Sequence, residues 1–116
     1  MITTEDYCSY EIAKLLKEKG FDGVCDYAYS NKGNWFEIDR SNFDEVYCLR
    51  PTHQMAIKWL REEKNIIINV WYNGVDWDAE HYNNEDENFY LITDPSCNSY
   101  EEAVEAALKY CLENLI

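Results

Sequence analysis

Residues 66–80, IIINVWYNGVDWDAE, carry the pattern that decides the fold of this chain. Six of the first seven residues are β-branched or aromatic, which is typical of a strand. Asn73-Gly74 follows, and this pair is favoured in tight hairpin turns. From Val75 to Glu80 apolar residues then alternate with acidic ones. The stretch therefore predicts an antiparallel hairpin whose second strand has one buried and one solvated face.

Three segments with apolar residues at helical spacing surround this hairpin in the sequence. Ser9, Thr52 and Ser99 stand just before them, and all three residue types cap helix N-termini well. Gly20 and Asn65 follow the first two segments and can adopt the left-handed conformation that ends a helix. We expect three amphipathic helices, the last running essentially to the C-terminus.

The remaining strands are predicted from shorter patterns. They are placed at 24–29 and 35–38, joined by a turn at 31–34, with an extended segment at 46–49 and a last strand at 89–93. The order helix, β-hairpin, helix, three-stranded meander, helix predicts one α+β domain over residues 1–116, an antiparallel sheet with its helices packed on one face. Pattern alone leaves open whether the first hairpin joins the meander, and it leaves the strand order open.

Charge is the one compositional extreme of the chain. Its 116 residues carry a net charge of −13. Residues 66–116 hold eleven acids and a single base, Lys109, for a net of −10. Such a surface repels phosphate backbones, so direct nucleic-acid binding is not expected.

The sequence also bears on the compartment. No apolar run approaches the roughly 20 residues of a membrane span, and the start, MITTEDYCSY, lacks the features of a signal peptide. We therefore expect a cytoplasmic protein with no membrane association. The five cysteines are an odd number without a Cys-x-x-Cys pair, which favours buried, reduced thiols over disulfides or a zinc site.

The densest carboxylates form the predicted partner surface. It comprises Asp76, Asp78, Glu80, Glu85, Asp86, Glu87, Glu101, Glu102 and Glu105. Charge steering would make binding at such a surface fast and salt-sensitive. A weak site for a hard cation such as calcium is an alternative, although alternate carboxylates on a strand also suit a plain solvated face. Tyr72, Tyr82 and Tyr90 are expected to add exposed aromatic surface nearby.

No catalytic, cofactor-binding or metal-ligating residue is assigned from the sequence. His53 and His81 are the only histidines and lie 28 positions apart, without a second ligand at zinc-site spacing. His53 is expected at the surface in the first turn of its helix. No cysteine has a partner base in the sequence that would make it a nucleophile.

Three stretches, SYEIAKLLKEKGFD, PTHQMAIKWLREEKNI and YEEAVEAALKYCLENLI, cover a little over a third of the chain. They resemble small uncharacterised proteins encoded by phages and prophages of gut bacteria. The resemblance implies a phage-related setting and assigns no functional residue.

Two hypotheses of function follow. The first is a non-enzymatic, acidic interaction protein of phage or mobile-element origin, with a protein partner of unknown identity. In one form of it the protein is a DNA-mimic-like inhibitor, whose carboxylates would lie in rows at roughly phosphate spacing. The second is a small enzyme with a carboxylate-containing pocket, which requires a pocket with an acid of raised pKa. Oligomeric state is not predicted.

Overall fold

The computed structural model describes residues 6–116 of the chain. Its helices are α1 (Tyr10–Glu18), α2 (His53–Glu63) and α3 (Tyr100–Asn114), with a 3-10 turn at Phe43–Glu45. Its strands are β1 (Tyr27–Tyr29), β2 (Trp35–Glu37), β3 (Cys48–Leu49), β4 (Ile67–Tyr72), β5 (Trp77–Asn83) and β6 (Asn88–Leu91). The predicted α+β class is confirmed, and the predicted order of helices and strands roughly matches the structure, with the short β3 inside the extended segment expected at 46–49.

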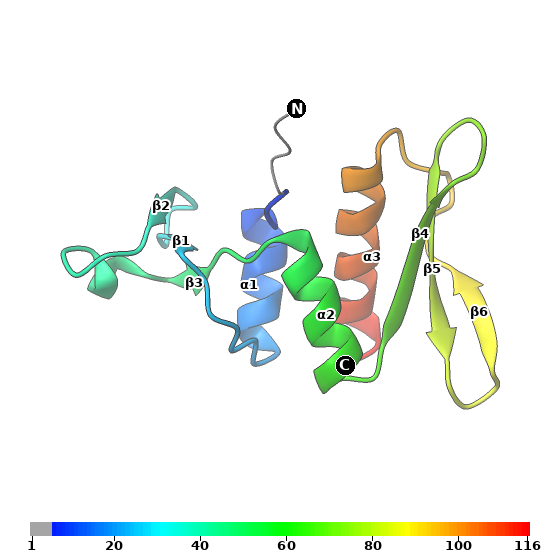
Figure 1. Ribbon diagram of the computed structural model, residues 1–116, viewed down its shortest axis with the longest axis horizontal. Helices are drawn as coiled ribbons and strands as arrows, with labels where there is room; N and C mark the ends of the chain where they lie inside the picture. The colour runs from blue at the N-terminus through cyan, green and yellow to red at the C-terminus, as the bar shows by residue number, and fades with distance from the viewer. Residues whose placement is uncertain (1–5) are drawn as a thin grey trace.

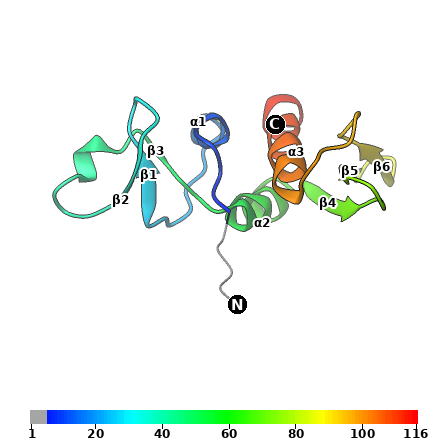
Figure 2. The ribbon, with the colours of Figure 1, turned by 90° about the horizontal axis from the view of Figure 1, so that it is seen from above.

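The strands form two separate antiparallel sheets, in the orders β2-β1-β3 and β4-β5-β6. The three helices lie between them, as both ribbon views show (Figures 1 and 2). Helices α2 and α3 cover one face of the β4-β5-β6 sheet, while α1 packs between α3 and β3. The first hairpin therefore stands apart from the meander, a question that the sequence pattern left open.

The β4-β5-β6 sheet has one covered face and one open face. Ala79 and His81 of β5 are buried beneath α3, and their partners across β4 are Val70 and Ile68. His81 stacks between the rings of Tyr90 and Tyr110, at centroid distances of 5.7 and 5.6 Å, so it serves the packing of the covered face. Because side chains alternate along a strand, the residues between these point away from the helices.

The β4–β5 connection differs from the predicted two-residue turn. Tyr72 pairs with Trp77, so Asn73–Asp76 form a four-residue loop, with Gly74 at a φ of 102°. The Asn73 side-chain oxygen accepts hydrogen bonds from the backbone N–H groups of Val75 and Asp76. This side chain organises the longer loop, and Val75 is left 80% exposed instead of facing the core.

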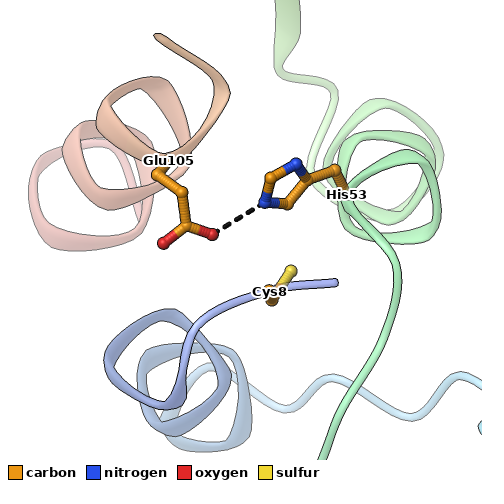
Figure 3. A group of neighbouring side chains, drawn as sticks. All are labelled: Cys8, His53 and Glu105. Atoms are coloured by element: carbon orange, nitrogen blue, oxygen red, sulfur yellow. Dashed lines mark hydrogen bonds and ion pairs between the residues drawn. The ribbon is translucent and has the colours of Figure 1, made fainter. Parts of the chain in front are cut away.

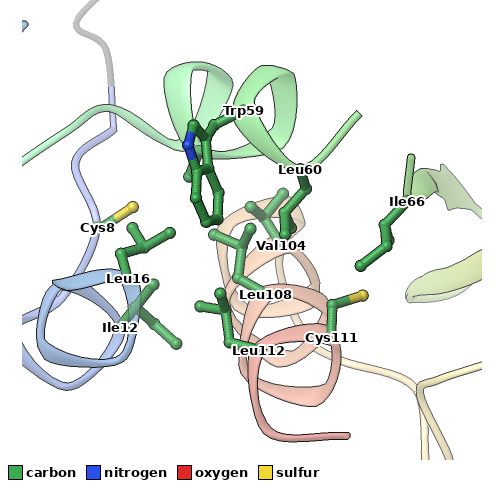
Figure 4. Close-up of a cluster of buried hydrophobic side chains, with 11 residues drawn as sticks. Cys8, Ile12, Leu16, Trp59, Leu60, Ile66, Val104, Leu108, Cys111 and Leu112 are labelled. Carbon is green, nitrogen blue, oxygen red and sulfur yellow. The ribbon is translucent and has the colours of Figure 1, made fainter. Parts of the chain in front are cut away.

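The main hydrophobic core lies where the three helices and β4 meet (Figure 4). Its fully buried side chains come from all three helices. They include Ile12, Leu16, Ala56, Leu60, Val104, Leu108 and Leu112, together with Cys8 and Cys111. Phe21 folds back after α1 and meets Trp59 edge-on, with ring centroids 5.7 Å apart. The core therefore lies on the apolar faces of the three amphipathic helices expected from the sequence.

A second, much smaller cluster attaches the β2-β1-β3 sheet to α1. Its buried members are Ala13, Tyr29 and Cys48. The Arg50 guanidinium lies 4.2 Å from the ring centroid of Tyr7 and 4.5 Å from that of Trp35. The sheet meets α1 itself through Tyr10, whose ring centroid lies 5.4 and 6.3 Å from those of Tyr29 and Tyr47, and through Lys17, whose Nζ lies 4.0 Å from the Tyr47 ring centroid.

Each helix begins at the residue that the sequence indicated. The hydroxyls of Ser9, Thr52 and Ser99 accept hydrogen bonds from backbone N–H groups in the first turns of α1, α2 and α3. After α1 and α2, Gly20 and Asn65 have φ values of 90° and 56°. The predicted caps and stops are confirmed.

Replacement of the α2 cap, Thr52→Ala, is expected to lower the free energy of unfolding by about 1 kcal/mol. The Thr52 hydroxyl accepts from the Met55 N–H at 3.1 Å, and alanine leaves that donor without a partner. Urea denaturation of the variant beside the wild type measures the loss. Thr52→Ser is the control because it keeps the oxygen, and an equal loss in both variants would contradict the capping role.

The cysteines are all free thiols. Cys8, Cys48 and Cys111 are buried, while Cys25 and Cys97 are only half-buried. Among the helices of residues 6–116, none has both the length and the apolarity needed to cross a bilayer.

Candidate functional site

A short antiparallel contact brings the N-terminal segment against the start of α2. The N–H of Cys8 donates to the Pro51 carbonyl at 2.9 Å, and the N–H of His53 donates to the Asp6 carbonyl at 2.8 Å. Because two backbone bonds fix this contact, the side chains of Cys8 and His53 are held at the same point, beside the N-terminus of α1.

Glu105, in the second turn of α3, reaches the same point. Its Oε2 atom lies 2.8 Å from His53 Nε2 and accepts from the Ser9 N–H at 3.2 Å. Burial alone would raise the pKa of Glu105, but the hydrogen bonds from His53 and Ser9 outweigh it and lower that pKa. The carboxylate therefore stays charged at neutral pH.

Cys8, His53 and Glu105 form a compact cluster in which one donor atom from each lies within 4.8 Å of the others (Figure 3). Cys8 and His53 are buried, and Glu105 is partly buried. Burial, together with the nearby Glu105 charge, raises the pKa of the Cys8 thiol. The thiol is therefore protonated at neutral pH and is not an activated nucleophile.

The cluster lies beneath an acidic cleft of about 410 Å³. Its lining residues are Asp6, Tyr7, Ser9, His53, Glu101, Glu102 and Glu105. Glu101, Glu102 and Glu105 of the predicted partner surface are thus brought together, and they line this cleft. The Glu105 side chain points inward to His53. With Asp6 the three glutamates give the cleft four carboxyl groups.

The other predicted surface residues lie on the β4-β5-β6 sheet and at its two ends. Asp76 is in the β4–β5 loop, Asp78 and Glu80 lie on β5, and residues 85–87 form the β5–β6 turn. Asp78 accepts from the side chains of Asn73, Thr93 and Ser96. It therefore anchors the loop, while Glu80 has no such structural role.

The open face of this sheet is rich in apolar side chains. We call it the outer sheet face; its residues are Ile67, Asn69, Trp71, Asp78, Glu80, Tyr82, Phe89 and Leu91. Trp71, Phe89 and Leu91 are 37%, 53% and 57% exposed, and the rings of Tyr82 and Phe89 lie 4.9 Å apart. No helix of residues 6–116 covers this face (Figures 1 and 2). Of the tyrosines expected to be exposed, Tyr72 and Tyr90 are, and Tyr82 is half-buried.

The predicted surface position of His53 is wrong, since only 4% of the residue is exposed. The prediction considered its place on α2 alone, where the first turn usually faces solvent. The N-terminal segment and α3 cover it instead. The residues next to His53 in the sequence do not indicate that the N-terminal segment and α3 pack against it. The cluster of Cys8, His53 and Glu105 was therefore not predicted.

Comparison with known proteins adds no relative: no family model matches the chain, and neither do any curated proteins or solved structures. The resemblance to phage-encoded proteins stays a prediction.

The hydrogen bonds to Asp78 predict a pH dependence of stability. Side-chain donors from Asn73, Ser96 and Thr93 lower the pKa of Asp78 below its ordinary value of 3.8. A carboxyl group whose pKa is lower in the folded than in the unfolded state stabilises the fold at pH values above its unfolded-state pKa. This stabilisation is lost as the pH falls through the folded-state pKa. We expect wild type to be more stable than Asp78→Asn at pH 6, and the difference to vanish in acid below 3.8. Urea denaturation at both pH values checks this, and a difference independent of pH would contradict it.

Proposed function

We propose that this protein is a non-enzymatic interaction protein that binds a basic protein partner through the outer sheet face. The observation that carries the proposal is the exposure of Trp71, Phe89 and Leu91 on a sheet face left uncovered by the helices of residues 6–116. Contiguous apolar surface of this kind, ringed by polar groups, marks sites of protein association.

The charge around the face selects the partner. Asp78 and Glu80 lie on the central strand among the apolar side chains, and the acidic turn at residues 85–87 lies at one end of the sheet. Lys109, the single base after residue 66, lies on α3 and pairs with Glu11 at 3.5 Å. Neither ion pair of residues 6–116 involves Asp78 or Glu80, so Glu80 is available to lysine and arginine side chains of a partner, while Asp78 adds its charge and keeps its hydrogen bonds to the loop.

The same charges disfavour a second copy of this chain as the occupant. In a two-fold dimer through this face, Asp78 and Glu80 of one copy would approach their equivalents in the other. Each copy carries a net charge of −13, so like charges would accumulate at the contact. A partner with a basic rim and an apolar centre avoids this cost.

The proposal does not extend to imitation of DNA. The nine predicted carboxylates are divided among the outer sheet face, the two ends of the sheet and the cleft beside α3. That distribution favours contact with a mixed apolar and acidic surface over a row of phosphate-like charges.

The enzymatic alternative finds less support. A pocket acid needs a raised pKa to donate a proton at neutral pH. Glu105, in the acidic cleft, has a lowered pKa, and the Cys8 thiol beside it is fully buried.

The experiment compares captured proteins between matched variants. The tagged wild type, a Phe89→Ser/Leu91→Ser variant and a Phe43→Ser variant are incubated with the same cell lysate at low and high salt. Phe43 is 73% exposed but lies in the 3-10 turn, far along the chain from the sheet. Each captured protein is then purified and its affinity for all three chains is measured.

We expect a basic protein that binds wild type and Phe43→Ser equally, binds the double variant at least about tenfold more weakly, and loses affinity with salt. Equal affinity for all three chains would overturn the proposal. So would concentration-dependent dimerisation of wild type that the double variant abolishes, because the face would then bind a second copy.

A further inference from the structure

We propose that Cys8, His53 and Glu105 form a binding site for a zinc-class transition-metal ion, with the acidic cleft giving access to it. The site is separate from the outer sheet face, and neither proposal depends on the other. It involves the N-terminal segment, the first turn of α2 and the second turn of α3, which are far apart in the sequence.

The donor set decides the class of metal. A thiol sulfur, an imidazole nitrogen and a carboxylate oxygen are the three protein ligands that Zn²⁺ uses, whereas calcium and magnesium take oxygen ligands. Cys8 and His53 are buried and Glu105 is partly buried. Three such donors converging from three separate elements are far more specific than the exposed carboxylates of the sheet.

The distances are close to those that a metal ion requires. Bond lengths of about 2.0–2.3 Å place tetrahedral ligand atoms roughly 3.4–3.7 Å apart. The three donor atoms lie within 4.8 Å of one another, and His53 Nε2 and Glu105 Oε2 are 2.8 Å apart. An ion between them needs that pair to open by under about 1 Å, while the sulfur closes in.

The arrangement fits a metal better than a catalytic triad. In a triad the two ring nitrogens of histidine are divided between nucleophile and carboxylate. Here Glu105 approaches Nε2, the Cys8 sulfur lies on that same side of the imidazole (Figure 3), and Nδ1 has no hydrogen-bond partner within residues 6–116. Sulfur and oxygen therefore converge on one nitrogen, as ligands of a shared ion do.

The cleft supplies both access and a fourth ligand position. Asp6, Glu101 and Glu102 line it together with His53 and Glu105, and their charges attract cations. Glu101 lies one helical turn before Glu105, so either its carboxylate or a water molecule can complete four-coordination. A three-ligand site with one open position has the ligand count of zinc sites that bind an exchangeable molecule.

Binding is balanced by the movement of protons. The ion displaces the thiol proton of Cys8 to solvent, and the neutral imidazole of His53 gives up its Nε2 proton to solvent and takes one from solvent on Nδ1, so the net release is one proton. No electron transfer occurs.

The test uses Co²⁺ as a spectroscopic substitute for Zn²⁺. The full chain is stripped with a chelator under reducing conditions and titrated with Co²⁺, then with Zn²⁺. We expect one equivalent of Co²⁺ to produce a thiolate-to-cobalt charge-transfer band and the intense visible bands of four-coordinate cobalt. One equivalent of Zn²⁺ then removes both, and excess Ca²⁺ does not.

Two cysteine variants show whether Cys8 is the ligand. Cys8→Ser is expected to lose the charge-transfer band and to bind Zn²⁺ at least about 100-fold more weakly, since even outer-shell changes cost ~10–100-fold. Cys48→Ser removes an equally buried thiol of the small cluster and is expected to bind normally. Circular dichroism of the metal-free variants confirms that each is folded.

Three results would overturn the assignment. The first is a folded wild type that shows no sulfur band at saturating Co²⁺. The second is a band that survives in Cys8→Ser, which would place the metal at another thiol. The third is displacement of Co²⁺ by Ca²⁺, together with unchanged metal affinity of Glu105→Gln. That result would mean that surface carboxylates alone bind the ion. Glu105→Gln keeps an oxygen for His53, so it separates loss of the metal from loss of the fold.

Discussion

Leu112→Ala is expected to lower the free energy of unfolding by about 3 kcal/mol. Leu112 is fully buried on α3, in the core shared with α1, α2 and β4 (Figure 4). Truncation removes apolar contact and leaves a cavity that rigid neighbours such as Leu108 cannot fill. A domain of this size is stable by only about 5–15 kcal/mol, so the loss is a large fraction of the total.

Urea denaturation followed by tryptophan fluorescence measures this loss. Leu115→Ala is the matched control, because Leu115 is the C-cap residue directly after α3 and is 36% exposed. We expect the control to lose less than about 1 kcal/mol. Similar losses at both positions would contradict the placement of the core between the helices.

Glu105→Ala is expected to have the second largest effect, a loss of about 2–3 kcal/mol in the metal-free protein. His53 is 4% exposed, and its Nδ1 atom already has no hydrogen-bond partner in the described part of the chain. Without Glu105 its Nε2 atom loses its hydrogen bond as well, and the Ser9 N–H loses its acceptor. Buried polar atoms without partners bear their full desolvation cost.

Glu105→Gln distinguishes the hydrogen bond from the charge. Glutamine keeps an oxygen that can accept from His53 and Ser9, so we expect it to recover more than half of the loss. Chemical denaturation of both variants, with a chelator present, gives the comparison. If glutamine were as destabilising as alanine, the charge of Glu105 would be the main contribution.

Local features of the fold could be predicted from the sequence because short-range chemistry determines them. Ser9, Thr52 and Ser99 cap helices through their own hydroxyls, and Asn65 stops α2 through its own backbone conformation. The alternation after Trp77 likewise placed Ala79 inward and Glu80 outward. None of these inferences required knowledge of a distant neighbour.

Long-range pairing could not be predicted in the same way. A strand pattern does not identify its partner, so the separation into two sheets became visible only in the structure. The four-residue loop at Asn73–Asp76 has a different and mainly local cause. Asn73-Gly74 favours a two-residue turn, but the Asn73 side chain instead bonds to the backbone of Val75 and Asp76 and to Asp78.

The candidate metal site was hidden for the same reason as the sheet pairing. Cys8, His53 and Glu105 are separated by 45 and 52 positions, and spacing rules detect only ligands that are close in sequence. Glu105 was predicted to belong to an exposed surface, because an acid on an amphipathic helix normally faces solvent. Only the contact of the N-terminal segment with Pro51 and His53 brings the three together.

The weak attachment of the β2-β1-β3 sheet has a consequence for dynamics. Strands of two or three residues, anchored by a cluster of three buried side chains, have little cooperative stability of their own. This sheet should open as a unit while α3 and the meander remain folded. In amide hydrogen exchange, residues 27–49 would then exchange through a sub-global opening. The α3 amides near Leu108 would exchange much later, because they require the whole chain to unfold.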